Sequence, residues 1–195
     1  MTTLATKKAA HAAWKRAYRL KYKAEYAAEK IRLLELKRAV KSLPCADCGK
    51  TMPPIAMEFD HLPGSDKKHK VSANYLSERS AFVEIGKCEV VCVLCHRNRT
   101  HARYRYSNSK TAIRKRALRE KVNALKEGPC VVCGNHYSPW QMDFDHMDPT
   151  IKVDKVSNLV RKRASYQLVV KEIAKCRLLC ALCHRLHTEE QAQNA

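Results

Sequence analysis

The sequence predicts an α+β fold made of two tandem copies of one small module, each preceded by a basic helix. The first observation is a repeat, because KCEVVCVLCHRNRTH at 87–101 returns at 175–188 as KCRLLCALCHRLHT. The second is that short runs of apolar β-formers lie just before the cysteines of both stretches. The third is that the segments ahead of the modules are rich in Ala, Lys, Arg and Leu, which favours helix.

The spacing of matching residues indicates an internal duplication. Cys45 and Cys130 lie 85 residues apart, whereas Cys92 and Cys180 lie 88 apart, so the second copy carries three additional residues in its middle. Two copies are too few for a solenoid. We therefore expect a monomer whose two modules form an intrachain pseudo-dimer.

The predicted organisation follows from the helix stop and start signals. Pro44 ends the first helical segment, Ser109 is placed to cap the second, and Gly128 follows it. The predicted segments are a basic helical arm over 1–43, a first module over 44–106, a basic linker helix over 107–128 and a second module over 129–190.

Each module is expected to run from strand to loop to strand to helix. The first strands are predicted at Ile55–His61 and Met142–His146, where apolar residues lead into Phe-Asp-His. In the first copy the second strand leads into a helix that begins at Leu94 and continues toward Tyr106.

The net charge predicts a polyanionic partner. The chain carries 38 Lys and Arg against 19 Asp and Glu, a formal charge of +19. A surplus of this size favours nucleic acid, bound with strong salt dependence. Charge alone does not distinguish a protein that reads, coats or cuts it.

The N-terminal sequence predicts neither export nor membrane insertion. MTTLATKKAAHAAWKRAYRL has charges every few residues, and no apolar run approaches a membrane span. We expect a cytoplasmic location, where paired cysteines bind metal more often than they form disulfides.

Eight of the ten cysteines form Cys-x-x-Cys pairs, and two pairs in each module can supply four thiolates to one Zn²⁺. The two predicted structural zinc sites consist of Cys45, Cys48, Cys92 and Cys95, and of Cys130, Cys133, Cys180 and Cys183. Cys88 and Cys176 are left over and are expected to be buried thiols. Cys-x-x-Cys-His is also a haem attachment motif, but haem would leave the other pairs unexplained.

Asp-His pairs end the first strand of each copy, at Asp60-His61 and at Asp145-His146. Adjacent strand residues point to opposite faces, so the two side chains should diverge unless the strand end is bent. His96 and His184 follow the second cysteine pairs. A carboxylate and an imidazole from facing elements suit Mg²⁺ or Mn²⁺, and a neighbouring His can take a proton from water. The alternative for each His is a structural hydrogen bond.

The arrangement CxxC…FDH…CxxCHRxxT resembles the HNH endonuclease family, including its small zinc-containing bacteriophage members, over 44–104 and 129–190. The resemblance implies two ββα-metal modules. It also implies roles for individual residues: Asp60, His96, Asp145 and His184 as ligands of the catalytic ion, and His61 and His146 as general bases.

One position departs from the family pattern. Lys87 and Lys175 stand where the family has an Asn that orients the base histidine. Asn74 and Asn158 are possible but unaligned substitutes.

The leading hypothesis is a metal-dependent DNA endonuclease with one divalent ion per module, in which His-activated water hydrolyses phosphodiester bonds and the two modules cut both strands. The alternative is a non-catalytic double zinc-knuckle protein that binds nucleic acid. A structural protein assembled on nucleic acid is a third reading, favoured only by the composition of the arm.

Overall fold

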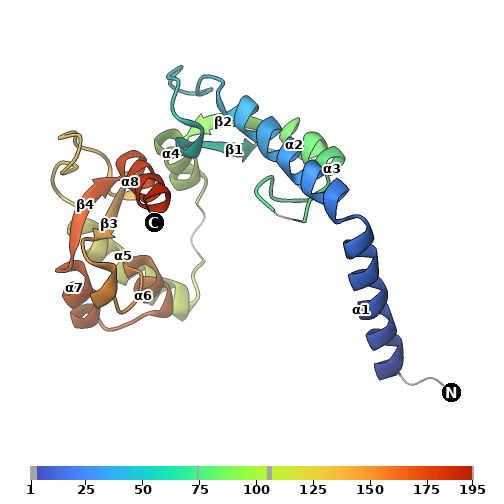
Figure 1. The fold of residues 1–195 in the computed structure, drawn as a ribbon. Helices are drawn as coiled ribbons and strands as arrows, with labels where there is room; N and C mark the ends of the chain where they lie inside the picture. Colours follow the sequence, from blue (N-terminus) through green and yellow to red (C-terminus); the bar gives the residue numbers. More distant parts are fainter. Residues whose placement is uncertain (1–3, 74, 105–106, 195) are drawn as a thin grey trace. The chain divides into compact units, whose positions relative to one another are not determined.

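The computed structural model describes residues 4–73, 75–104 and 107–194 and has a mixed α+β fold with two small antiparallel sheets. Contacts divide the chain into two compact units (Figure 1). The first unit comprises Met1–Pro44 and Phe59–Val90, and the second comprises Cys45–Glu58 and Val91–Ala195. Each unit is described by itself. Within the described residues, no helix is both long and apolar enough to cross a membrane.

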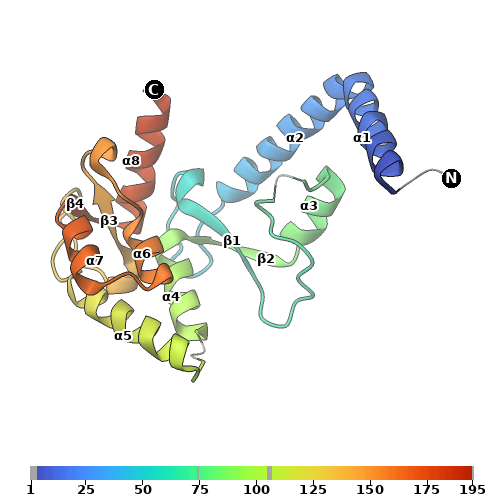
Figure 2. The same ribbon diagram turned by 90° about the horizontal axis from the view of Figure 1, so that it is seen from below.

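The basic arm consists of two helices rather than one continuous helix. α1 (Leu4–Lys21) ends before Tyr22, and α2 (Lys23–Lys41) follows it. Tyr22 leaves helical geometry, with φ −105° and ψ 14°, and Figure 2 shows the chain changing direction there.

The side chains of α1 that are described are exposed, and its aromatic residues stack on one another along the helix. Trp14 and Tyr18 have ring centroids 5.3 Å apart, and Tyr18 and Tyr22 have centroids 4.4 Å apart. Six cations and no acidic residue accompany them on this helix: Lys7, Lys8, Lys15, Arg16, Arg19 and Lys21. α1 therefore presents an aromatic and strongly basic surface.

α2 packs against α3 (Glu78–Ile85) and so belongs to the body of the first unit. Leu33 is buried in one apolar cluster with Leu76. Polar contacts flank this cluster, since Lys30 Nζ donates to the Leu76 carbonyl at 2.8 Å and the Glu78 N–H donates to Glu29 at 2.9 Å.

The first sheet pairs β1 (Met57–His61) with β2 (Cys88–Cys92), and α4 (Val93–Arg103) follows directly. β1 begins two residues later than predicted, because Pro54 opens a short 3-10 turn, η1 (Pro54–Ala56). α4 ends at Arg103, and Tyr106, toward which the sequence extended it, lies outside the described residues.

α5 (Lys110–Ala124) begins as the sequence predicts, because Ser109 accepts a hydrogen bond from the Ala112 N–H at 3.2 Å. Glu127, where the sequence ended this helix, lies beyond it.

The second sheet pairs β3 (Met142–His146) with β4 (Cys176–Cys180) in antiparallel register. Asp145 lies opposite Arg177 and Asp143 lies opposite Leu179. The strand predicted at Met142–His146 has those bounds. A short turn, η2 (Pro139–Gln141), precedes β3, and α8 (Ala181–Gln193) follows β4.

The three additional residues of the second copy coincide with an additional helix. After the 3-10 turn η3 (Pro149–Ile151) comes α6 (Val156–Lys162), which ends at Arg163 in left-handed geometry, φ 60°. α7 (Tyr166–Ile173) then corresponds to α3, and both are capped by a serine, Ser165 and Ser77 respectively.

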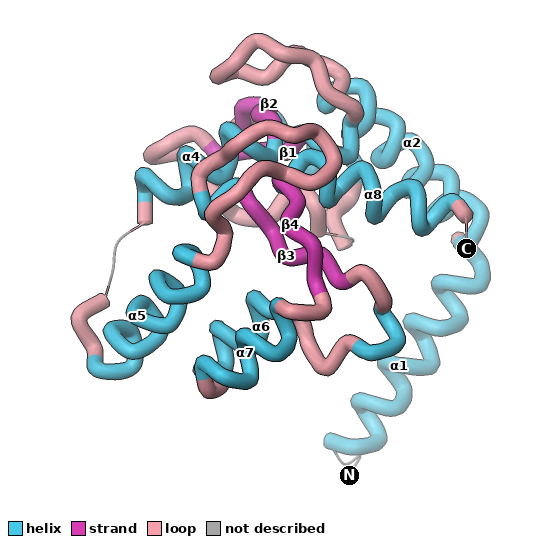
Figure 3. The backbone as a smooth tube through the Cα atoms, turned by 90° about the vertical axis from the view of Figure 1, so that its left-hand side faces the viewer, coloured by secondary structure: helices cyan, strands magenta, loops and turns pink. Residues whose placement is uncertain are grey.

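The core of the second copy has two parts. Val122 of α5 packs with residues of α6 and α7, among them Leu159 and Val169. Met142 and Leu179 pack around the cysteines of the same copy. Figures 1 and 3 show α5, α6 and α7 on the side of the β3–β4 hairpin away from α8.

Candidate functional site

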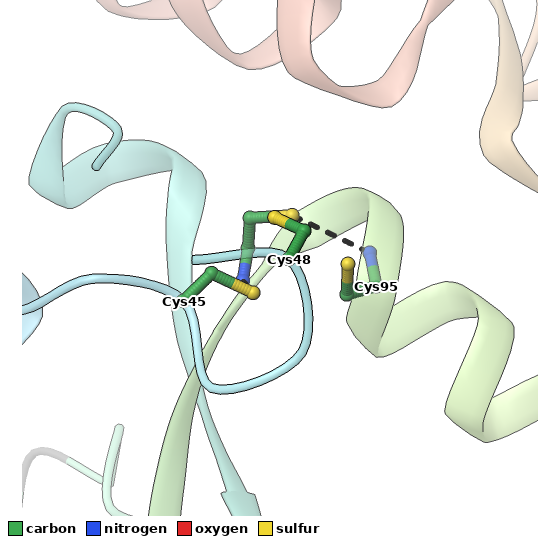
Figure 4. A group of neighbouring side chains, drawn as sticks. Cys45, Cys48 and Cys95 are labelled. Carbon is green, nitrogen blue, oxygen red and sulfur yellow. Dashed lines mark hydrogen bonds between the residues drawn. The ribbon is translucent and has the colours of Figure 1, made fainter. Parts of the chain in front are cut away.

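The eight paired cysteines converge into two four-thiol groups, as the sequence predicts. In each group the four sulfurs lie within 4.8 Å of one another. Sulfurs bound to one tetrahedral zinc by bonds of 2.3 Å are about 3.8 Å apart, so little movement is needed to hold the ion. Figure 4 shows Cys45, Cys48 and Cys95 turning toward one region between a loop and the start of α4. Both groups therefore fit a structural Zn²⁺.

Backbone N–H groups favour the thiolate form of one cysteine in each group, Cys45 and Cys130. Burial opposes ionisation of Cys130, but the N–H groups of Cys133 and Cys180 lower its pKa to about 6. Burial and then the neighbouring Cys180 raise the pKa of Cys183. Four thiols this close cannot all ionise without a cation, because their negative charges repel one another. A bound dication would make all four thiolates favourable.

The leftover cysteines lie outside these groups. Cys176 Sγ donates to the Glu172 carbonyl at 3.4 Å, and Cys88 Sγ donates to the Glu84 carbonyl at 3.2 Å. Burial first, and then the nearby Glu, raise the pKa of each thiol to about 11. Both are neutral, partly buried thiols tied to the backbone.

The predicted site of the second copy lies within one unit, and its Asp-His pair diverges as the alternation of a strand requires. Asp145 faces α8, where His184 Nε2 lies 3.5 Å from its Oδ1. His146 faces α7, where its Nε2 lies 2.8 Å from Glu172 Oε1. The structure thus brings Asp145 and His184 together and turns His146 to the other face.

A second carboxylate fixes the orientation of His184. Its Nδ1 lies 3.0 Å from Asp143 Oδ2. Burial opposes ionisation of Asp143, but His184 and Arg97 hold the pKa of this carboxyl well below its usual range. The ionised carboxylate only accepts, so Nδ1 donates to Asp143, and Nε2 is the ring nitrogen that faces Asp145. An imidazole nitrogen facing a carboxylate oxygen is a donor pair that suits a small divalent cation.

Two further side chains reach Asp145. Arg177, its partner across the strands, donates from Nε to Oδ2 at 3.0 Å. His187 places Nε2 3.9 Å from the same oxygen. Neither residue was predicted from the sequence to belong to the site, although His187 lies three residues after His184 on one helix face. Oδ2 is therefore shared, while Oδ1 is the oxygen that faces His184.

His146 belongs to a buried polar network. Its side chain is only 7% exposed, and that of Glu172 is 1% exposed. Burial opposes ionisation of Glu172, but Lys175, the Val153 N–H and His146 lower its pKa to about 2. Glu172 therefore accepts the hydrogen bond from His146 Nε2. This is the structural hydrogen bond that the sequence left open as the alternative for each His.

The first copy repeats this network within the other unit. His61 Nε2 lies 3.0 Å from Glu84 Oε2, and Lys87 Nζ lies 2.7 Å from Glu84 Oε1. Hydrogen bonds from Lys87 and His61 lower the pKa of Glu84 to about 2. Asp60 is buried in the same unit, whereas His96 belongs to the unit that holds the second copy.

Glu84 and Glu172 thus contact His61 and His146 respectively. Asn158 instead donates to Asp154 at 2.9 Å, and Asn74 lies outside the described residues. A signal for the two glutamates exists in the sequence. Both stand four residues before a leftover cysteine, in EIGKC and EIAKC.

A basic cleft of about 650 Å³ opens in the second unit beside α4, α5 and α6. Trp140 lines it and stacks on His101, with ring centroids 3.7 Å apart and planes 6° apart. Burial lowers the pKa of Lys126, which also lines the cleft, to about 8. The cationic residues of the lining are Arg97, Lys115, Arg119, Lys126, Arg161 and Arg185.

No family model, curated protein or solved structure matches this chain. Its function has to be argued from the geometry of its own residues.

The cysteine groups predict two zinc ions per chain by elemental analysis. Cys130→Ser should remove one ion and unfold the second copy, because binding of a structural zinc supplies on the order of 10 kcal/mol. Cys176→Ser is the matched control and should keep both ions, since its thiol bonds only a backbone carbonyl. A Soret band, or two zinc ions in Cys130→Ser, would contradict the assignment.

The buried network predicts that Glu172→Gln lowers the free energy of unfolding by about 1.5–3 kcal/mol, the value of hydrogen bonds to a charged group. Because folding depresses the pKa from 4.5 to about 2, the contribution of Glu172 is present above pH 4.5 and lost as the pH falls toward 2. Urea unfolding of zinc-loaded protein at pH 7 measures the loss. The exposed Glu190→Gln should change it by less than about 0.5 kcal/mol.

Proposed function

We propose that the chain is a metal-dependent endonuclease of the HNH type, with two ββα-metal modules that hydrolyse phosphodiester bonds in double-stranded DNA. The observation that carries the proposal is the facing pair of Asp145 Oδ1 and His184 Nε2, 3.5 Å apart beside a four-thiol group. A protein that only used zinc to fold would have no need of this second donor pair.

In the second copy Asp145 and His184 would hold a divalent cation such as Mg²⁺ or Mn²⁺. When bound, such a cation stabilises negative charge on the scissile phosphate and the leaving oxygen. The chain itself orients the pair, since Asp143 holds the proton on His184 Nδ1 and directs Nε2 to the site. Asp60 and His96 are the residues of the first copy that correspond to this pair in the sequence.

The general base is assigned to His146, and to His61 in the first copy. Glu172 accepts a hydrogen bond from Nε2–H, so Nδ1 would be the ring nitrogen that takes the proton from water. The ring is nearly buried and faces α7, so water must reach it at the end of β3. His187, which lies on the face of Asp145, is the competing candidate.

Phosphates would be bound by the basic cleft of the second unit. Its lysines and arginines supply cations, and the stacked pair of His101 and Trp140 offers an aromatic plane. Side chains of this kind hold a nucleic-acid strand without reading its sequence.

A non-catalytic zinc protein that binds nucleic acid is the second candidate. Two observations favour it: His146 is held in a buried hydrogen bond, and Arg177 pairs with the carboxylate of Asp145. Both would suit a scaffold whose site no longer turns over.

Cleavage of supercoiled plasmid separates the two candidates. With Mg²⁺ or Mn²⁺ the chain should linearise plasmid, and EDTA should stop it. His61→Ala and His146→Ala should each nick one strand, with the other strand cut about 10²–10⁴-fold more slowly, the usual contribution of a general base. The double variant should bind without cutting.

His187→Ala identifies the base of the second copy. If His146→Ala still linearises plasmid while His187→Ala only nicks it, then His187 is the base. A protein that binds plasmid but never cuts it, with either metal, supports the second candidate and overturns the first.

The exposed arm predicts a change in affinity but not in fold. Deleting residues 1–22 removes the six cations of α1 but keeps the contacts of Glu29 and Lys30 with α3 and its preceding loop. Both zinc ions should remain bound. The slope of log affinity against log salt should flatten by up to about 5, at about 0.9 per phosphate contact. Fluorescence anisotropy across a salt series measures it, and an unchanged slope would contradict the role of the arm.

A further inference from the structure

The two copies exchange arginines at their histidine–carboxylate pairs. Arg97 of the first copy donates through both terminal nitrogens to Asp143 of the second copy, at 2.9 and 2.7 Å. Asp143 is the carboxylate that holds His184 Nδ1 at 3.0 Å. The orientation of His184 is therefore completed by a side chain from the other copy.

The exchange is reciprocal. Arg185 of the second copy donates to Glu58 of the first copy, and Glu58 contacts His96 Nδ1. The same compact unit holds both arginine–carboxylate pairs, so their side chains are placed relative to one another: Arg97, Asp143, Arg185 and Glu58. By the spacing of the duplication, Arg185 is the counterpart of Arg97, and Glu58 is the counterpart of Asp143.

A backbone contact accompanies each arginine in the same way. Arg97 Nη1 also donates to the Trp140 carbonyl at 3.1 Å, and Arg185 Nη1 donates to the Ile55 carbonyl at 3.0 Å. Trp140 and Ile55 are again counterparts, 85 residues apart. Around them α4 packs on η2, α8 packs on η1, and α4 packs on α8. An isologous interface has this property, since each contact occurs twice with the roles exchanged.

The chemistry at the shared carboxylate is specific. The two oxygens of Asp143 accept hydrogen bonds from the planar guanidinium of Arg97, and Oδ2 also accepts one from His184 Nδ1. A bidentate guanidinium fixes the plane of a carboxylate, which a lysine ammonium cannot do. Fixing that plane fixes the direction of His184 Nε2 toward Asp145.

We propose that Arg97 and Arg185 are positioning residues that act in trans, each orienting the metal-ligand histidine of the other copy through Asp143 or Glu58. Each site is then incomplete without the other module. This inference rests on the proposed function for its activity assay but not for its binding assay.

The test uses the full chain with one copy silenced. In an Asp60→Ala background only the second copy can cut, and Arg97→Ala should slow nicking by about 10–100-fold, the usual cost of losing a partner of a metal-bound histidine. In an Asp145→Ala background the same Arg97→Ala should have a clearly smaller effect on the nicking rate. There Arg185→Ala should be the variant that slows nicking. Arg97→Lys should restore only part of the rate.

The control is Arg99→Ala on the same helix, because Arg99 pairs with Asp47 of its own copy, at 2.9 Å from Nε to Oδ2. It should leave the nicking rate within about threefold in both backgrounds. Zinc content of two ions per chain shows that each variant is folded. If Arg97→Ala loses zinc, the test rests on Arg97→Lys alone. In the Asp60→Ala background that variant must then nick plasmid more slowly than the protein that keeps Arg97.

Binding of Mn²⁺, measured by electron paramagnetic resonance in the Asp60→Ala background, gives a readout that does not need turnover. Arg97→Ala should weaken it about 10–100-fold. A protein whose Mn²⁺ binding depends on Arg97 in this way but that never cuts DNA would support the positioning role of the arginines and overturn the proposed endonuclease activity. Equal effects of Arg97→Ala in the two silenced backgrounds, or no effect on nicking or Mn²⁺ in either, would overturn the proposal.

Discussion

Four thiolates brought to one point are the constraint on which each copy depends. In the second copy the hairpin has five-residue strands, and its small core of Met142 and Leu179 packs around cysteines rather than around larger side chains. Burial and mutual repulsion oppose ionisation of such thiols, so the group is favourable only around a cation. A zinc ion held by this group would join the loop before β3 to the start of α8. It would thereby help to place His184, one residue after Cys183, beside the strand that carries Asp145.

Duplication within one chain allows the two copies to share charges that neither could place alone. An arginine partly buried against an interface needs a carboxylate, and the partner copy provides one at the corresponding position each time. Arg97 and Arg185 are thereby paired, and Asp143 and Glu58 remain charged although partly buried. A covalent link keeps the shared pairs together at any protein concentration, which a free dimer could not do.

The sequence predicted much of this architecture because its strongest signals are periodic or local. The duplication, both cysteine groups, the strand at Met142–His146 and the cap at Ser109 follow from spacing and from residue type. The partners of the histidines were not predicted, because Glu172 meets His146, and Asp143 meets His184, only through tertiary packing. Asn158 was a reasonable substitute by residue type, but it lies on α6 beside Asp154. The break at Tyr22 carries neither Gly nor Pro and so gave no signal.

The scaffold repeats more faithfully than the charges placed on it. Asp145 faces Arg177 across the strands, whereas the position of the first copy that corresponds to Arg177 holds Glu89. An arginine beside a metal-binding carboxylate lowers its affinity for a cation, and a glutamate at the same place raises it. Cations held as proposed would therefore be bound unequally, because the charge of Glu89 would favour a cation in the first copy and the charge of Arg177 would oppose one in the second. The same arginine would favour a phosphate beside Asp145, so the two copies would differ in the proposed reaction even though their ligand residues are the same.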